Sequence, residues 1–138
     1  LKKMSKSEVS DLSRINLTDD KDQIINKIKK AKTDSLPLPS KIEELEKRPE
    51  AKNLIGIYSS LMNNTLQKSI DEFAGKNFSE FKEKLSDVLV NEINPISLKI
   101  KELLDDKVFL EKILKEGYEK ANEIASKKIK KIHEIVGF

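Results

Sequence analysis

Apolar residues recur at intervals of three and four along most of this chain, and this spacing predicts amphipathic helices. No turn dipeptide is flanked by alternating apolar residues, so nothing in the pattern predicts a β-hairpin. The sequence therefore predicts an all-α fold, a bundle of about five helices preceded by a mobile loop. The predicted helices cover residues 19–33, 49–62, 65–73, about 77–103 and 106–138.

Prolines and capping residues mark where these helices begin and end. Two prolines remove amide donors within residues 35–40, so this segment is predicted to be a linker. Thr18 or Asp19 offers an oxygen to cap the first helix, and Gly75 stands where a left-handed cap is needed. Pro95 should bend the long helix that contains it or divide it in two.

The apolar stripes indicate which side chains form the core. Four aromatic residues lie at core spacing, and we expect packing anchors there rather than platforms for stacked bases: Phe73, Phe78, Phe81 and Tyr118. The stripe of the last helix stays in register almost to the end of the chain. Its members are Leu114, Tyr118, Ala121, Ala125, Ile129, Ile132 and Val136.

Composition excludes several kinds of site. The 138 residues include no cysteine and one histidine, which excludes a disulfide framework, a thiolate zinc site and a histidine-rich metal site. An acidic run at Glu43, Glu44 and Glu46 lacks partner ligands, so no metal site is predicted. The net charge of +3 permits nucleic-acid binding without indicating it. No apolar run approaches the roughly 20 residues that cross a bilayer, so we expect no membrane partner and a cytoplasmic protein.

The candidate chemistry lies at the start of the chain, in the run Lys3-Met4-Ser5-Lys6-Ser7. Its two lysines supply compact positive charges on flexible stems, and serine hydroxyls with nearby amides can bond phosphate oxygens. Such a loop could neutralise charge on a departing pyrophosphate. Taken alone, the same run is also typical of a solvated, disordered terminus in a lysine-rich chain.

These five residues match, letter for letter, the KMSKS signature of class I aminoacyl-tRNA synthetases. The rest of the chain resembles bacterial or organellar tryptophanyl-tRNA synthetases, and the resemblance covers essentially all 138 residues. One departure follows the signature directly, where Glu8-Val9 stands in place of the Asp-Pro that is more usual in the family. The resemblance is carried by residues 10–20, 28–35, 48–50, 53–54, 57–58, 73–78, 81–82, 117, 121, 125 and 136–137.

The resemblance implies a division of the chain and roles for its residues. Residues 1–17 would be the signature loop and a connector from the catalytic domain, and residues 18–138 the C-terminal helical domain of the anticodon-binding type. Lys6 and Lys3 would be catalytic, and the whole run from Lys3 to Ser7 would bind ATP. A loop that closes on ATP and reopens must move, so we expect poor order over roughly the first 10 to 15 residues.

The same resemblance implies the reaction of a parent enzyme, in which tryptophan is activated with ATP and Mg²⁺ to tryptophanyl-adenylate and then transferred to tRNA(Trp). That parent would be a homodimer with a Rossmann-like catalytic domain. Nothing in this chain resembles that domain or its first ATP signature, and the chain starts at Leu1 rather than at a methionine. We therefore expect a C-terminal fragment that is inactive alone, binds no ATP alone and need not dimerise.

Lysines on the helices are candidates for contact with tRNA, because phosphate contacts dominate affinity for nucleic acid. The predicted tRNA-binding residues cluster on the first helix: Lys27, Lys29, Lys30 and Lys32. A second lysine cluster lies near the end of the chain, within residues 127–131. Ordinary solubilising lysines occupy the same kind of helix face, so charge alone does not separate the two roles.

Two other interpretations stay open. A stand-alone helical RNA-binding module would bind tRNA in a salt-sensitive way without ATP chemistry. A helical interaction protein with a disordered tail would bind no tRNA, and Lys6→Ala would change only local charge. Tyrosyl-tRNA synthetases are disfavoured, because their signature loop usually departs further from KMSKS.

Overall fold

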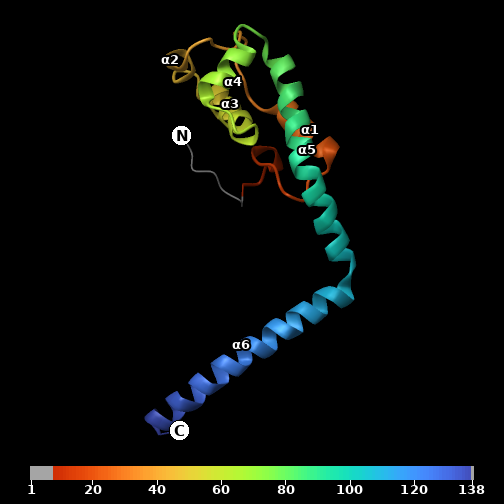
Figure 1. Cartoon of the computed structure of the whole chain (residues 1–138), viewed down its shortest axis with the longest axis vertical. Coiled ribbons are helices and arrows are strands. Elements are labelled where there is room, and N and C mark those ends of the chain that lie inside the picture. Colours follow the sequence, from red (N-terminus) through yellow and green to blue (C-terminus); the bar gives the residue numbers. More distant parts are fainter. Residues whose placement is uncertain (1–7, 138) are drawn as a thin grey trace. The chain divides into compact units, whose positions relative to one another are not determined.

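The computed structural model describes residues 8–137, and its regular elements are all helical. These residues form one short 3-10 helix and six α-helices, without a strand, which confirms the predicted all-α class. Figure 1 shows the two longest helices, α5 and α6, in the second half of the chain. The elements are η1 (Asp11–Ser13), α1 (Lys21–Lys30), α2 (Ile42–Leu45), α3 (Pro49–Leu61), α4 (Leu66–Phe73), α5 (Phe78–Asp105) and α6 (Lys107–Val136).

The chain divides into two compact units, Leu1–Leu98 and Lys99–Phe138. In the first unit, α1 to α5 and the linker share one apolar core. Four of the five predicted helices correspond to α1, α3, α4 and α5, and the polar stretch 41–47 contributes the short α2. The fifth, predicted over 106–138, is α6, which contributes no residue to this core. The core residues are Ile24, Ile28, Leu38, Leu45, Ala51, Leu54, Ile55, Tyr58, Ile70, Phe73, Phe78, Phe81, Leu85 and Leu89.

Three aromatic rings lie at the centre of this core. The Tyr58 ring centroid is 5.0 Å from that of Phe73 and 5.9 Å from that of Phe81, in edge-to-face geometry. The Tyr58 hydroxyl donates to Glu72 Oε1 at 2.9 Å, which satisfies the polar end of a buried ring. Burial, together with the Glu72 carboxylate, raises the pKa of Tyr58 to about 12. Phe73, Phe78 and Phe81 are all buried, so their predicted role as packing anchors is confirmed.

A reciprocal cap starts α1. Asp20 Oδ1 accepts from Gln23 N at 2.9 Å, and Gln23 Oε1 accepts from Asp20 N at 2.9 Å. This capping box satisfies two amides at once, which explains why Asp20 is the cap rather than the predicted Thr18 or Asp19. The helix ends at Lys30, three residues before the predicted end, where the chain turns into the linker.

One arginine holds the linker to the bundle. Arg48 Nε donates to Asp34 Oδ2 at 2.8 Å, and Arg48 Nη1 donates to the Pro37 carbonyl oxygen at 2.7 Å. Its Nη2 donates to Asp34 and to the Leu36 carbonyl oxygen, and the guanidinium carbon lies 5.5 Å from the centroid of the Phe78 ring. A planar fork of five donors can make these bonds together. The Arg48 hydrogen bond, opposed by partial burial, lowers the pKa of Asp34 below its ordinary 3.8.

Backbone hydrogen bonds also tie the linker to the turn between α4 and α5. Leu38 N donates to the Lys76 carbonyl oxygen at 2.8 Å, and Gly75 N donates to the Leu38 carbonyl oxygen at 3.0 Å. Gly75 has a φ of +74°, which confirms the predicted left-handed cap. The linker therefore has no regular secondary structure, but hydrogen bonds hold it both to Arg48 and to the turn between α4 and α5.

α5 runs unbroken from Phe78 to Asp105 and includes Pro95. Of the two predicted alternatives, one long helix or two, the structure has one. Proline removes a single intrahelical bond, and the turns on either side keep the remaining bonds of the helix. At its start, Asn77 Oδ1 accepts from Glu80 N at 2.9 Å.

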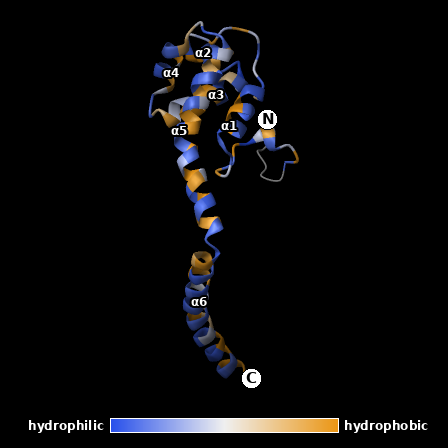
Figure 2. Cartoon of the chain, turned by 90° about the vertical axis from the view of Figure 1, so that its right-hand side faces the viewer, coloured by the Kyte–Doolittle hydropathy of each residue, from blue (hydrophilic) through white to orange (hydrophobic). Residues whose placement is uncertain are grey.

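The second unit consists mainly of α6. Asp106 Oδ1 accepts from Phe109 N at 2.9 Å, which confirms the predicted start of the helix. The helix ends at Val136, slightly before the predicted end, and Gly137 follows it with a left-handed φ of +85°. Figure 2 shows hydrophobic positions distributed along α6 between hydrophilic ones. Tyr118 is 67% exposed, so its predicted role as a packing anchor is wrong within this unit, because a single long helix offers its stripe nothing to pack against.

Candidate functional site

The signature run from Lys3 to Ser7, including the predicted catalytic residues Lys6 and Lys3, lies outside the described residues. Glu8 directly follows the run. Within the described residues the candidate site therefore consists of the connector, residues 8–17, then residues 18–20 and the helix α1 that follows them. Three connector residues, Glu8, Asp11 and Arg14, have defined contacts.

The connector folds around one carboxylate. Asp11, in η1, accepts from Asn16 Nδ2 at 2.9 Å and lies 3.1 Å from Arg14 Nη2. Arg14 Nη1 also donates to the Glu8 carbonyl oxygen at 3.1 Å. A series of contacts thus leads from Glu8 through Arg14 to Asp11.

Lys27 joins this turn to α1. Its Nζ lies 2.6 Å from Asp11 Oδ2 and 2.6 Å from Asp19 Oδ2, and only 6% of the lysine side chain is exposed. Asp19 is equally buried, and its carboxylate also accepts from Asn16 N at 2.8 Å. A buried ammonium is stable only when opposite charges surround it, and here two carboxylates do so. We call Asp11, Asp19 and Lys27 the ion cluster.

The ion cluster shifts the pKa values of its members. Hydrogen bonds from Lys27 and then from Asn16 lower the pKa of Asp11 below its ordinary value of 3.8. Burial by itself would lower the pKa of Lys27, but hydrogen bonds to Asp11 and Asp19 outweigh burial and raise this pKa above 10.5. Lys27 and Asp11 therefore both carry their charge throughout the neutral pH range.

The four lysines predicted to contact tRNA occupy different environments. Lys27 belongs to the ion cluster, so the structure gives it a packing role in place of the predicted tRNA contact: a phosphate would have to displace two carboxylates. Lys29, Lys30 and Lys32 are exposed at the end of α1 and just beyond it. Lys32 Nζ lies 3.4 Å from Glu50 Oε1, but the lysine side chain is 87% exposed, so this pair is weak.

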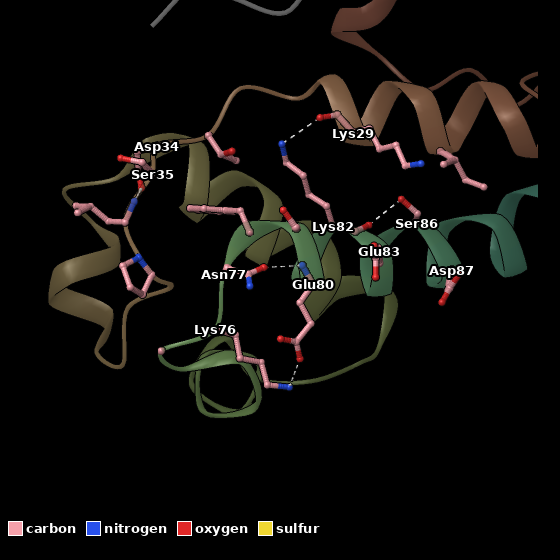
Figure 3. Close-up of a pocket in the computed structure, with 17 residues that line it drawn as sticks. Lys29, Asp34, Ser35, Lys76, Asn77, Glu80, Lys82, Glu83, Ser86 and Asp87 are labelled. Atoms are coloured by element: carbon pink, nitrogen blue, oxygen red, sulfur yellow. Dashed lines mark hydrogen bonds and ion pairs between the residues drawn. The ribbon is translucent and has the colours of Figure 1, made fainter.

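A groove of about 1050 Å³, which Lys29 lines, lies between the end of α1, the linker and the start of α5. Figure 3 shows Lys82 reaching from α5 toward the backbone of α1. Its Nζ donates to the Ala31 carbonyl oxygen at 2.6 Å and to the Lys29 carbonyl oxygen at 3.2 Å. A cation is favoured there by the negative end of the helix dipole. Burial lowers the pKa of Lys82.

Charges of both signs line the rest of this groove. Lys76 Nζ pairs with Glu80 Oε1 at 3.0 Å, as Figure 3 also shows. Asp34, Glu83 and Asp87 add carboxylates to the lining. The groove therefore lacks the positive field that would attract a polyphosphate.

Some of these residues could have been found from the sequence and others could not. Lys27 lies three residues after Ile24 and one before Ile28, on the apolar face of α1, and a lysine on such a face requires a buried partner. No spacing rule connects Lys82 with carbonyl groups 51 and 53 residues away, or Arg48 with Asp34, 14 residues away. These contacts depend on how the helices pack.

Other candidate sites receive little support. In the second lysine cluster, Lys127 Nζ lies 2.6 Å from Glu123 Oε1 on the surface of α6. Within residues 8–137, no three His, Cys, Asp or Glu side chains are grouped so as to hold a metal ion. The helices in the described part of the chain are all too short or too polar to span a membrane.

Comparison with known proteins assigns the family. A family model described as tRNA synthetases class I (W and Y) matches residues 1–94, which include the signature run, the connector and the ion cluster. The chain belongs to this family. The match also covers the groove and the first part of α5, so the family extends through the helical core described above.

Individual relatives are similar in sequence to this chain along nearly its whole length. A tryptophan–tRNA ligase from Agrobacterium fabrum is 50% identical over 137 residues, 99% of this chain and 39% of that protein. The tryptophan–tRNA ligase of Brucella melitensis is 47% identical over the same share of each chain. That of Rickettsia felis is 49% identical over 138 residues, 100% of this chain and 41% of that protein. The chain therefore spans about two fifths of the length of the curated relatives it matches.

Proposed function

We propose that this chain is the C-terminal portion of a tryptophan–tRNA ligase. The observation that carries the proposal is that relatives with this name are 47–50% identical to it from end to end. The whole enzyme would activate tryptophan with ATP, taken as its Mg²⁺ complex, and transfer the product to tRNA(Trp). We propose the division already expected from the sequence, with residues 1–17 as signature loop and connector and residues 18–138 as the helical domain.

The loop would act on the first step. When the tryptophan carboxylate attacks the α-phosphate, negative charge develops on the departing pyrophosphate. Lys6 and Lys3 would stabilise that charge, with Met4, Ser5 and Ser7 completing the ATP-binding run. The remainder of the ATP and tryptophan site would lie outside this chain, so the chain by itself should be inactive and bind no ATP.

The exposed end of α1 would serve the second step. Lys29, Lys30 and Lys32 are exposed together, and Lys29 borders the groove beside α5. Lysines can hold the phosphate backbone while an unstacked base enters a neighbouring polar groove. The homodimer of the family and a cytoplasmic location belong to the same proposal.

The test uses the full-length enzyme that contains this chain. Lys6→Ala should slow tryptophan-dependent ATP–pyrophosphate exchange by roughly two to three orders of magnitude, as expected when one preorganised donor is lost. Lys41→Ala is the matched control, because it removes an exposed lysine before α2. Equal exchange rates in the two variants would argue against the proposal.

The tRNA contact has its own test in the aminoacylation reaction. The double variant Lys29→Ala/Lys30→Ala should raise KM for tRNA about tenfold at moderate salt, because two phosphate contacts are lost. Lys68→Ala, which removes an exposed lysine from α4, should leave KM for tRNA unchanged. If the two changes have the same effect, the end of α1 is not a tRNA contact.

A further inference from the structure

A charged residue on the apolar face of α1 calls for an explanation other than stability. Lys27 lies between Ile24 and Ile28, which are both buried. An apolar side chain there would complete the face without the cost of desolvating ions, and buried ion pairs are often no more stabilising than such a side chain. The ion cluster instead fixes the position of Asp11 and Asp19 relative to α1, because charged hydrogen bonds at 2.6 Å constrain both distance and direction.

One member of the ion cluster, Asp11, lies close in sequence to the signature run. Asp11 follows Lys6 by five residues, which span at most about 18 Å even when fully extended. From Asp11 the contacts continue through Arg14 to the carbonyl oxygen of Glu8, the residue directly after the signature run. Fixing Asp11 on α1 therefore limits where the two signature lysines can reach.

We infer that Lys27 and Asp11 are positioning residues for ATP activation, which hold the connector on α1 and so set the base from which Lys3 and Lys6 reach ATP. This inference rests on the proposed function and adds the residues that orient its catalytic loop. Neither Lys27 nor Asp11 touches ATP. Asp19 completes the arrangement, because it keeps Lys27 paired from the other side.

Asp11→Ala in the full-length enzyme is the informative variant. Asp11 is 52% exposed, and Asp19 still neutralises Lys27 after the change, so the fold should persist. The kcat of ATP–pyrophosphate exchange should fall about 10-fold to 100-fold, since a displacement of about 1 Å in a catalytic group can have that effect. KM for tryptophan should stay close to the wild-type value, and any fall in Tm should leave the enzyme folded at the assay temperature, since Asp19 keeps Lys27 paired. Asp22→Ala, which removes an exposed acid from the first turn of α1, is the matched control.

A second measurement separates positioning from a general loss of structure. If Asp11 acts through the two loop lysines, adding Asp11→Ala to the double variant Lys3→Ala/Lys6→Ala should slow exchange by no more than about twofold. Losses that multiply overturn the inference, and so does a kcat for Asp11→Ala equal to that of Asp22→Ala. An inactive wild-type enzyme, or a fully active Lys6→Ala variant, overturns the proposed function instead, so the two failures can be told apart.

Discussion

Replacing Arg48 with alanine should lower the free energy of unfolding of the first unit by about 2–3 kcal/mol. The Arg48 side chain is only 14% exposed, and it donates to Asp34 and to the carbonyl oxygens of Leu36 and Pro37. Asp34 is 39% exposed, so solvent screening limits the ion pair to about 1 kcal/mol. The two carbonyl bonds and the contact with the Phe78 ring add about 1–2 kcal/mol.

Urea unfolding of the 138-residue chain measures this effect, with near-ultraviolet circular dichroism reporting the packed Tyr58 ring. Asp34→Ala should cost about 1 kcal/mol, since only the carboxylate is lost. Arg48→Lys should recover less than half of the loss, because an ammonium cannot replace the planar fork. Lys47→Ala, an exposed neighbour, is the control and should stay within about 0.5 kcal/mol of the wild type. Full recovery by Arg48→Lys, or a loss of under about 0.5 kcal/mol for Arg48→Ala, would refute the reasoning.

Three other perturbations test separate parts of the first unit. Tyr58→Phe removes the hydrogen bond to Glu72 and should cost about 1 kcal/mol in urea unfolding; unchanged stability would mean that water replaces the bond. Gly75→Ala should lower Tm through a cost of about 1 kcal/mol, because φ is +74°, and Gly75→Asn should lower it less. The pKa of Asp11 is lowered, so its pairing with Lys27 stabilises the fold above about pH 4 and is lost as the pH falls through that lowered pKa. The difference in urea midpoint between wild type and Asp11→Ala should therefore shrink on acidification, and a constant difference would contradict the ion cluster.

Features that depend on a few neighbouring residues could be predicted from the sequence. Thr65 and Asp106 cap the helices that follow them, and Gly75 adopts a left-handed conformation after α4. Each of these features is settled by hydrogen bonds within about four residues or by the absence of a Cβ atom. Pro49 likewise begins α3, where its missing amide is not needed. The apolar spacing was sufficient for the all-α class.

Where two local choices competed, the sequence did not decide between them. Asp19 and Asp20 are both capping residues by type, but Asp19 turns inward to Lys27 and Asp20 is left to pair with Gln23. Pro95 could have divided its helix, yet α5 continues through it. The choice of cap depends on the contact between Asp19 and Lys27, and the course of α5 depends on the helical turns on either side of Pro95.

The sequence by itself determined the helical class, most helix ends and the chemistry offered by Lys3 and Lys6, because these depend on residue type and on spacing within one or two turns. Only the tertiary structure decided that Lys27 is buried between carboxylates while Lys29 stays exposed, and that Lys82 caps a helix 51 residues earlier in the chain. Whether a charged side chain is buried or exposed depends on which partners the packing of the helices brings close to it. That information lies in the arrangement of the helices, since desolvation and pairing act through space rather than along the chain.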